Sequence, residues 1–239
     1  MTITRLRPSP AGPVALEELP ELYPRRDEPV LRVNFVSSLD GAATLDGHSG
    51  GLGDPTDQEI LKTLRTVCDA LVVGAATVRG ENYDGLRLDP SRRAWREERG
   101  LPAYPLMVVV SRSLDLDLDQ LVFADAPRRP VVLAGGGTAK MRRQVERVAD
   151  VVATDDLAAG IAALHERGAT QVFCEGGPRL LGALLEADLV DELCLTVSPL
   201  LTAGDASRIA HGGQAVRREM SLRHILAEED MLFLRYARR

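Results

Sequence analysis

The chain has 239 residues, of which 45% are hydrophobic and 27% are charged, and its formal net charge is −6. These values are typical of a globular protein that is long enough to form one sizeable core. An acidic balance without a long basic run argues against nucleic acid or an anionic membrane as a partner. The aromatic fraction of only 4% also argues against stacking platforms for single-stranded nucleic acid.

The three cysteines, Cys68, Cys174 and Cys194, are isolated on apolar segments. Without C-x-x-C spacing they indicate reduced thiols, and the N-terminus lacks the apolar stretch of a secretory signal, so we expect a cytoplasmic protein. The sequence contains no run of eighteen apolar residues, so no transmembrane helix is predicted. The four histidines are far apart, and the H-x-E and P-C-x-x-C motifs of zinc deaminases are missing, so we expect no metal site.

Residues 1–29 contain six of the fourteen prolines and show little periodicity, so we expect an irregular N-terminal arm that wraps the domain or a partner. Residues 30–239 are expected to form one domain. Strand-like and helix-like runs alternate from residue 30 onward, which is typical of an α/β fold with a mainly parallel sheet flanked by helices. The last three strand-like runs follow one another without helices, which predicts antiparallel strands at the C-terminus.

The expected elements have the following bounds. Strands are predicted at 31–37, 70–73, 106–110, 131–133, 151–153, 171–174, 192–197, 222–227 and 231–236. Helices are predicted at 57–67, 138–147, 157–167 and 179–187. The strongly charged segment 90–102 is interpreted as a solvated helix or loop, because charge runs usually face water, and a substrate lid is the alternative.

Three of the strands end in small or glycine-rich turns, which begin near Gly74, Gly135 and Gly176. Ligands of open α/β sheets bind outside the carboxyl ends of the strands, and glycines there let the backbone approach a ligand. Pro178 suits the first turn of a helix, whose free N–H groups favour phosphate. Three such turns in one chain indicate a nucleotide cradle, although the G-x-G-x-x-G fingerprint is missing and each turn alone is also an ordinary βα connection.

Four motifs occur in order along the chain. They are S-L-D-G from Ser38, L-R-x-x-x-D-A-L-V-V-G-x-x-T-V from Leu64, E-G-G-P-x-L-L from Glu175, and V-D-E-L-C-L-T-V-S-P-L-L from Val190. In this order they resemble the riboflavin-biosynthesis pyrimidine reductases, over roughly residues 31–236. The resemblance implies a dihydrofolate-reductase-like fold, NADPH as the cofactor, and a small-molecule substrate. The implied reaction reduces a ribosylaminopyrimidine 5′-phosphate to its ribityl product.

The resemblance also implies a substrate slot beside the nicotinamide, at the S-L-D-G loop with Ser38 and Leu39. Asn34 belongs to this slot, since the monofunctional enzymes of the family often have Asn where the bifunctional bacterial enzymes have Lys. A polar residue in an apolar strand is alternatively hydrogen-bonded in the core. After Thr77 the chain departs from the family pattern T-V-x-x-D-D-P-x-L-x-x-R, and only Arg87 is left as a basic anchor for the substrate phosphate.

The remaining implied residues are a proton source and the cofactor contacts. Asp40, Glu81 and Glu175 are the candidates for the catalytic carboxylate, and the sequence does not choose among them. We expect Glu175 to matter for turnover or cofactor positioning rather than for folding. The predicted cofactor-binding residues are Gly74, Thr77, Val78, Ser111, Arg112, Gly135, Gly136, Gly176, Gly177 and Pro178.

Ser111 and Arg112 carry the expected preference for NADPH over NADH. In dihydrofolate-reductase-like proteins the corresponding strand end lies near the adenosine ribose, and a guanidinium matches the oxygens of a 2′-phosphate. The alternative for Arg112 is a solvated surface arginine. A homodimer is also expected, because members of the family are commonly dimers and the apolar run 190–201 reads as an uncovered edge strand.

Two other functions remain open at the level of sequence. The first is a dihydrofolate or other pterin reductase, which would use the same fold and the same cradle. The second is a non-catalytic NADPH-binding protein, since a fold alone does not decide a function. The sequence also leaves open whether a pyrimidine substrate is already deaminated.

Overall fold

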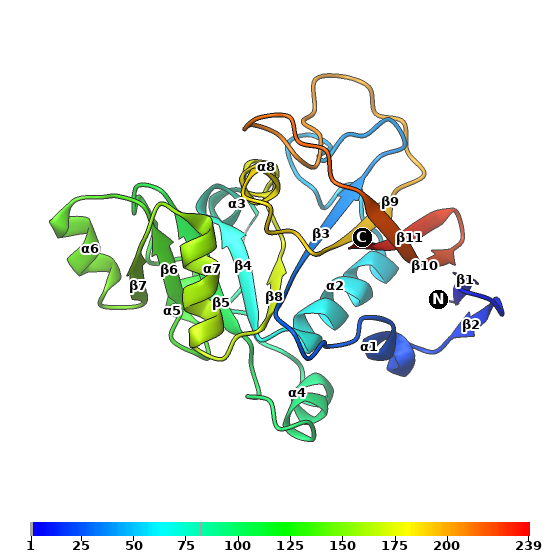
Figure 1. Ribbon diagram of the computed structural model, residues 1–239, viewed down its shortest axis with the longest axis horizontal. Helices are drawn as coiled ribbons and strands as arrows, with labels where there is room; N and C mark the ends of the chain where they lie inside the picture. The colour runs from blue at the N-terminus through cyan, green and yellow to red at the C-terminus, as the bar shows by residue number, and fades with distance from the viewer. Residues whose placement is uncertain (1, 82) are drawn as a thin grey trace.

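The computed structural model describes residues 2–81 and 83–239. Over these residues one eleven-stranded sheet has the order β2-β1-β10-β11-β9-β3-β8-β4-β5-β6-β7, with helices on both faces (Figure 1). The ladders from β9 through β7 are parallel, whereas β9, β11, β10, β1 and β2 are joined by antiparallel ladders. The predicted α/β class, a mainly parallel sheet flanked by helices with antiparallel strands at the C-terminus, is confirmed.

The elements have these bounds. The strands are β1 (Ile3–Arg7), β2 (Gly12–Val14), β3 (Val30–Ser37), β4 (Ala70–Gly74), β5 (Leu106–Ser111), β6 (Val131–Ala134), β7 (Asp150–Ala153), β8 (Gln171–Cys174), β9 (Glu192–Val197), β10 (Met220–Glu228) and β11 (Met231–Arg238). The helices are η1 (Leu16–Glu18), α1 (Leu19–Leu22), α2 (Pro55–Val67), α3 (Ala75–Gly80), α4 (Pro90–Glu97), α5 (Leu121–Ala124), α6 (Ala139–Val145), α7 (Leu157–Glu166) and α8 (Pro178–Glu186).

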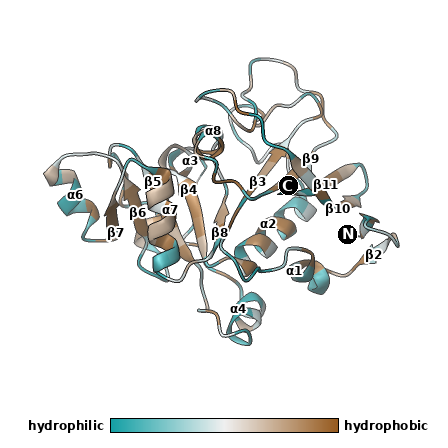
Figure 2. Ribbon diagram, in the orientation of Figure 1, coloured by the Kyte–Doolittle hydropathy of each residue, from teal (hydrophilic) through white to brown (hydrophobic). Residues whose placement is uncertain are grey.

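Successive side chains of the central strands point to opposite faces of the sheet, and this divides the core into two clusters. In β4, Leu71 and Val73 join the cluster that contains the apolar side of α2, whereas Ala70 and Val72 join the cluster that contains α7 and α8. Because side chains of a strand alternate between faces, a strand covered on both sides becomes apolar throughout. Figure 2 shows this as hydrophobic colour along the central strands.

Residues 1–29 were expected to be irregular, and this is wrong for the parts that form β1, β2, η1 and α1. Strand β1 pairs antiparallel with β10, with Thr4 opposite Ala227, and β2 pairs with β1. Ile3, Leu19 and Tyr23 are each only 1% exposed. The sequence pattern missed these strands because each is short and because their partner lies at the other end of the chain.

Strand β9 lies inside the sheet, between β3 and β11. Its residue Leu195 stands opposite Leu234 of β11 and pairs in parallel register with Phe35 of β3. Among the described strands the sheet ends at β2 and β7 instead. The expectation that 190–201 presents an uncovered edge is therefore wrong, and it gives no support to a homodimer.

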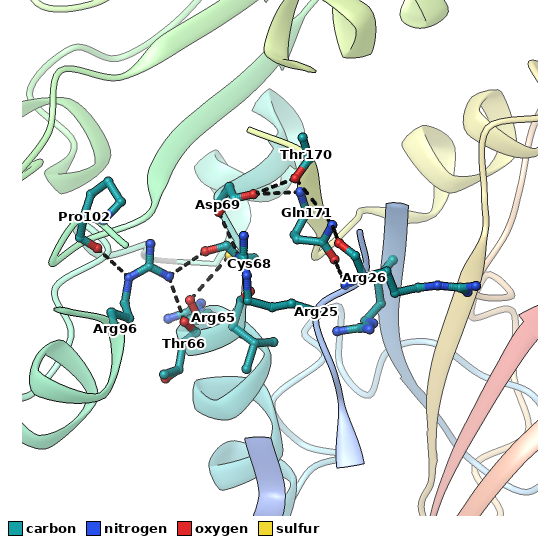
Figure 3. A network of polar contacts seen from close by, with 12 residues as sticks. Arg25, Arg26, Arg65, Thr66, Cys68, Asp69, Arg96, Pro102, Thr170 and Gln171 are labelled. Carbon is teal, nitrogen blue, oxygen red and sulfur yellow. Dashed lines mark hydrogen bonds and ion pairs between the residues drawn. The ribbon is translucent and has the colours of Figure 1, made fainter. Parts of the chain in front are cut away.

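The charged segment 90–102 forms α4 and a short connection. Asp89 caps this helix by accepting a hydrogen bond from the Arg92 amide at 3.0 Å. Arg96 is buried and donates to the carbonyls of Thr66, Cys68 and Pro102, which fixes α4 to the end of α2 (Figure 3). Thr66, Cys68 and Pro102 precede β4 and β5, so α4 is held at the amino ends of these strands. Sheets of this class bind ligands at the carboxyl ends, so the alternative of a substrate lid is wrong.

The three thiols are free and buried, and burial raises the pKa of each of Cys68, Cys174 and Cys194 to about 12. None of the described helices combines the length and the apolar character that crossing a bilayer requires.

Candidate functional site

A cleft of about 1110 Å³ opens at the carboxyl ends of the parallel strands. Ligand pockets usually measure about 300–1,000 Å³, so this cleft can hold a dinucleotide together with a small substrate. It lies where open α/β sheets bind ligands. Of the predicted site residues, the cleft is lined by Asn34, Gly74, Thr77, Glu81, Ser111, Arg112, Gly135, Glu175, Gly177 and Pro178.

The turn after β8 is built for a close backbone approach. The Gly74 amide donates to the Gly176 carbonyl at 2.8 Å, and Gly176 has a φ of +98°, which favours glycine. A Cβ on Gly177 would lie 2.7 Å from Oγ1 of Thr77. Gly177 is the N-cap of α8 and supplies no side-chain cap. Because Pro178 has no N–H and the Leu180 amide donates to the Gly177 carbonyl at 2.9 Å, the Arg179 amide is the one in this first turn that is left for a phosphate.

The ends of β5 and β6 form the second part of the cradle. A Cβ on Gly136 would lie 2.9 Å from the Arg112 carbonyl, so these two turns also need glycine to pack. Ser111 is buried and its hydroxyl accepts from the Leu114 amide at 3.1 Å, which shapes the turn. Arg112 is exposed, lines the cleft, and forms no ion pair with a described acidic residue.

Glu175 is not a free carboxylate. Its two oxygens accept a bidentate pair of hydrogen bonds from Arg65, at 2.6 and 2.7 Å, and a further one from the Tyr83 hydroxyl. The side chain of Glu175 is 4% exposed and that of Arg65 is 17% exposed. Burial alone lowers the pKa of Arg65, but the charge and hydrogen bonds of Glu175 outweigh it and raise that pKa.

Burial and the neighbouring Glu175 charge raise the pKa of Tyr83, so its hydroxyl remains a donor. Both oxygens of Glu175 are therefore taken up as acceptors for Arg65 and Tyr83, and the carboxylate positions these two side chains at the cleft. The sequence reading missed Arg65, although the motif that contains it was one of the four that carry the resemblance.

Asp57 is a buried carboxyl group in the cleft lining that the sequence did not lead us to expect; Asp155, Asp156 and Glu186 also line the cleft, at its cradle side. Asp57 is 7% exposed, lines the cleft from the first turn of α2, and accepts a hydrogen bond from Oγ1 of Thr196 at 2.6 Å. Burial raises the pKa of Asp57, the hydrogen bond from Thr196 partly offsets this, and the charge of Asp54 adds to it. One signal was available: Asp57, Leu61 and Arg65 are spaced at i, i+4 and i+8 and share one face of α2.

The other two predicted carboxylates have defined partners. Glu81 accepts hydrogen bonds from the Ser49 amide and hydroxyl, at 3.0 and 3.1 Å, and so holds the glycine-rich loop of residues 47–53 against the end of α3. Asp40 lies outside the cleft lining and accepts from Ser38 and from the Ala203 amide at 2.7 Å. The Ser38 hydroxyl, then the loop amides, lower the pKa of Asp40 to about 2, so it cannot supply a proton near neutrality.

Six further predicted residues do not line the cleft. Ser38 is buried and donates to Asp40 at 2.5 Å, whereas Leu39 is 60% exposed. Val78 is 1% exposed and packs in the core, because α3 turns its apolar side inward. Arg87 forms a bidentate pair with Asp125, at 2.7 Å for both bonds, on the surface. Arg87 therefore does not provide the expected phosphate anchor. Gly136 and Gly176 shape the cradle turns without lining the cleft.

The cleft has two halves of different character. The cradle half is lined by three basic side chains, from Arg79 of α3, Arg112 after β5 and Arg179 of α8, and by three acidic ones, from Asp155, Asp156 and Glu186. The half formed by β3, the glycine-rich loop and α2 is lined by Asn34, Thr44, Ser49, Asp57 and Gln58, with Glu81 from the end of α3, and these residues are polar or acidic. The cradle half therefore offers guanidinium groups to the phosphates of a ligand, and the other half offers hydrogen-bonding groups to a ring.

Comparison with known proteins agrees with this geometry. The family model of the RibD C-terminal domain matches residues 29–232. The chain belongs to this family. A relative from Archaeoglobus fulgidus, 26% identical over 202 residues that cover 82% of this chain and 92% of the relative, is named 2,5-diamino-6-ribosylamino-4(3H)-pyrimidinone 5′-phosphate reductase. Membership of this reductase family implies a nicotinamide cofactor.

Solved structures extend the comparison. A pyrimidine reductase-like protein from Corynebacterium diphtheriae superposes with a TM-score of 0.83 at 27% identity, covering 95% of this chain and 99% of the other. The riboflavin biosynthesis reductase Rib7 of Saccharomyces cerevisiae has a TM-score of 0.64 at 16% identity, over 94% of this chain and 97% of that one. The second likeness shows the shared fold alone.

Proposed function

We propose that the chain is an NADPH-dependent reductase that converts a ribosylaminopyrimidine 5′-phosphate to its ribityl product in riboflavin biosynthesis. The observation that carries this is the two-part cleft. A glycine-lined cradle with the N-terminus of α8 and basic side chains adjoins a polar slot that contains Asn34 and Asp57. The close packing of the two turns supports a dinucleotide there, because glycine at 177 leaves backbone and no side chain at the wall: a Cβ would lie 2.7 Å from Oγ1 of Thr77.

The nicotinamide supplies a hydride when it is bound. With the ribosyl ring open, C1′ of the substrate is double-bonded to the exocyclic nitrogen. Hydride addition at C1′ then gives the ribitylamine, and the nitrogen takes one proton. The protein has to place the ring, exclude water and provide that proton.

We assign the proton to Asp57. Glu175 is held as an acceptor by Arg65 and Tyr83, Asp40 lies outside the cleft, and Glu81 is engaged by Ser49. Burial raises the pKa of Asp57 towards the range in which a carboxylic acid serves as a general acid. Asn34 lines the same half of the cleft and can hydrogen-bond the pyrimidine ring.

The preference for NADPH belongs to the same proposal, with Arg112 as the contact to the 2′-phosphate. Removing a charge-assisted hydrogen bond costs about 1.5–3 kcal/mol. Arg112→Ala should therefore raise the Michaelis constant for NADPH by about tenfold or more and leave that for NADH nearly unchanged. Arg143→Ala on α6, an exposed arginine outside the cleft, is the matched control. Equal effects on both cofactors would contradict the assignment.

A second candidate function, pterin reduction, is favoured by one observation. The expected phosphate anchor, Arg87, is paired with Asp125 outside the cleft, and the substrate half contains Asp57 but no described basic side chain. A steady-state assay of NADPH oxidation, with ribosylaminopyrimidine phosphates and dihydrofolate side by side, decides between the two. Tight NADPH binding without turnover of either substrate would instead favour a non-catalytic protein.

We also propose a cytoplasmic homodimer. The location is supported by the free, buried cysteines and by the biosynthetic role in the relatives' names. The dimer rests on the family resemblance alone, since β9 is covered. Sedimentation at micromolar concentration tests it, and a monomer would refute it.

A further inference from the structure

A second, smaller pocket lies at the opposite edge of the sheet from the cleft. It has a volume of about 90 Å³ and is lined by Asp69, Arg96, Pro102, Leu106, Arg128, Arg167, Gly168 and Ala169. Asp69, Leu106 and Ala169 stand at the amino ends of β4, β5 and β8. This volume exceeds the roughly 10–15 Å³ that one water needs.

Arg96 is the buried floor of this pocket. Its side chain is fully buried, and it donates from Nε to the Pro102 carbonyl at 2.7 Å and from Nη1 to the carbonyls of Thr66 and Cys68 at 2.7 and 2.5 Å. Its Nη2 is buried and has no hydrogen-bond partner in the described part of the chain. Figure 3 shows this nitrogen pointing away from all three carbonyl groups. A buried donor without an acceptor is costly, so a ligand oxygen would satisfy it.

The charge around the pocket is unbalanced. Arg128 uses Nη1 for the Tyr104 carbonyl at 3.1 Å, and the guanidinium of Arg167 makes no hydrogen bond or ion pair with any described residue. Asp69 is the acid among the lining residues, and its carboxylate is taken by Arg25 at 2.9 Å and by the Gln171 amide at 2.8 Å. Burial lowers the pKa of Arg96; Cys68 and Asp69 partly offset this, and the charges of Arg25 and Arg128 lower it further.

We infer that this pocket binds a small tetrahedral oxyanion of the phosphate or sulfate class. Three arginines, Arg96, Arg128 and Arg167, line a space large enough for such an ion, and guanidinium forks match its oxygens. The site lies at the amino ends of the strands and is separate from the cleft at their carboxyl ends. It does not depend on the proposed reductase activity.

The test is the melting temperature of the full chain in inorganic phosphate, compared with chloride at equal ionic strength. A ligand that binds only the folded state raises the melting temperature, by about 3–6 °C at ten times its Kd for a chain of this size. Arg167→Gln and Arg128→Gln should each abolish the phosphate-specific shift. Arg143→Gln, the same change on α6 away from both pockets, should retain it. Glycerol phosphate in place of phosphate shows whether the site takes a free ion or the end of a larger molecule.

The cleft could also bind phosphate, so Arg112→Ala serves as the second control. The inference requires that this cleft variant keeps the shift while the two pocket variants lose it. The inference is overturned if the wild type responds equally to phosphate and chloride. It is also overturned if Arg128→Gln and Arg167→Gln keep the full shift, or if Arg112→Ala alone removes it.

Discussion

Two buried carboxyl groups of the cleft have opposite environments, and this separates their roles. Glu175 faces a guanidinium and a phenol, whereas Asp57 faces a single hydroxyl, from Thr196. Burial raises the pKa of Asp57, whereas Arg65 and Tyr83 occupy both oxygens of Glu175. We therefore expect Glu175 to act by position and Asp57 by proton transfer.

Asp57→Asn should lower kcat by about 10²-fold or more, because general acids contribute about 10²–10⁴-fold. NADPH affinity should remain, since Asp57 lies in the substrate half of the cleft. The raised pKa of Asp57 means that the acid form is lost as pH rises through it, so the alkaline decline of kcat should disappear in the variant.

Asp54→Asn is the control for this prediction. It changes the same charge at the same helix end, but Asp54 caps the amide of Asp57 at 2.7 Å, a role that Asn also fills. Asp54 does not line the cleft, and its variant should keep nearly normal kcat. Equal losses in both variants, or an unchanged alkaline limb in Asp57→Asn, would remove Asp57 from the reaction.

Glu175→Gln should lower stability as well as turnover, which revises the expectation from the sequence. The substitution leaves Arg65 without its bidentate partner, and breaking a buried pair costs about 3–5 kcal/mol. Calorimetry should show a clearly lower melting temperature. Tyr83→Phe removes one hydrogen bond to the same carboxylate and should cost less. An unchanged melting temperature for Glu175→Gln would show that this ion pair contributes nothing to stability.

At the scale of elements, glycine allows the turns after β4 and β8 to lie in contact, with the Gly74 amide donating to the Gly176 carbonyl. Gly177→Ala would place a methyl group 2.7 Å from Oγ1 of Thr77, the one neighbour it meets. We predict a raised Michaelis constant for NADPH and a lower melting temperature. The double variant Gly177→Ala with Thr77→Ala removes the clashing atom, so it should recover the melting temperature but not the NADPH affinity.

If the double variant recovers both properties, the turn is a packing contact and not a cradle. Gly176→Asp would be a less informative change, because the φ of +98° and the ring of Phe35 at 2.9 Å from a Cβ would strain the fold itself. Any loss of cofactor binding in that variant would then be ambiguous.

The positions of many strands and helices were predictable from the sequence, and the contacts that were not predicted have physical causes. Apolar runs bounded by glycine located β4, β5, β6 and β8 to within one or two residues. Periodicity could not show that β11 covers β9, because pairing between distant strands leaves no local signal. It also could not show that Arg87 pairs with Asp125, or that Arg96, a residue of the charged helix α4, is buried.

At the scale of the whole molecule, one buried network joins the N-terminal arm to the sheet. Glu192 is fully buried and accepts from Arg32 at 2.7 Å and from Arg235 at 2.6 Å. Both arginines also donate to carbonyls of residues 22–24, at the end of α1 and just beyond it. The arm is thus held by charge as well as by the β1 ladder.

Glu192→Gln should lower the free energy of unfolding at neutral pH by about 3–5 kcal/mol, because two buried guanidinium groups lose their counter-charge. The melting temperature should fall accordingly. Burial raises the pKa of Glu192, but the arginines outweigh this and lower it. Its contribution is therefore present above the unfolded pKa and is lost as pH falls through the lower folded pKa. The gap between variant and wild type should narrow in acid, and a gap that widens there would contradict this account.

The most direct test of the proposed function follows the hydride itself. The purified protein is given NADPH with deuterium at the transferred position, together with a ribosylaminopyrimidine phosphate, and the product is examined by NMR. We expect the wild type to place one deuterium at C1′ of a ribityl chain. Asp57→Asn, at matched NADPH occupancy, should form no labelled product. Recovery of the substrate without deuterium, while dihydrofolate in a parallel reaction becomes labelled, would contradict it and assign the cleft to pterin reduction.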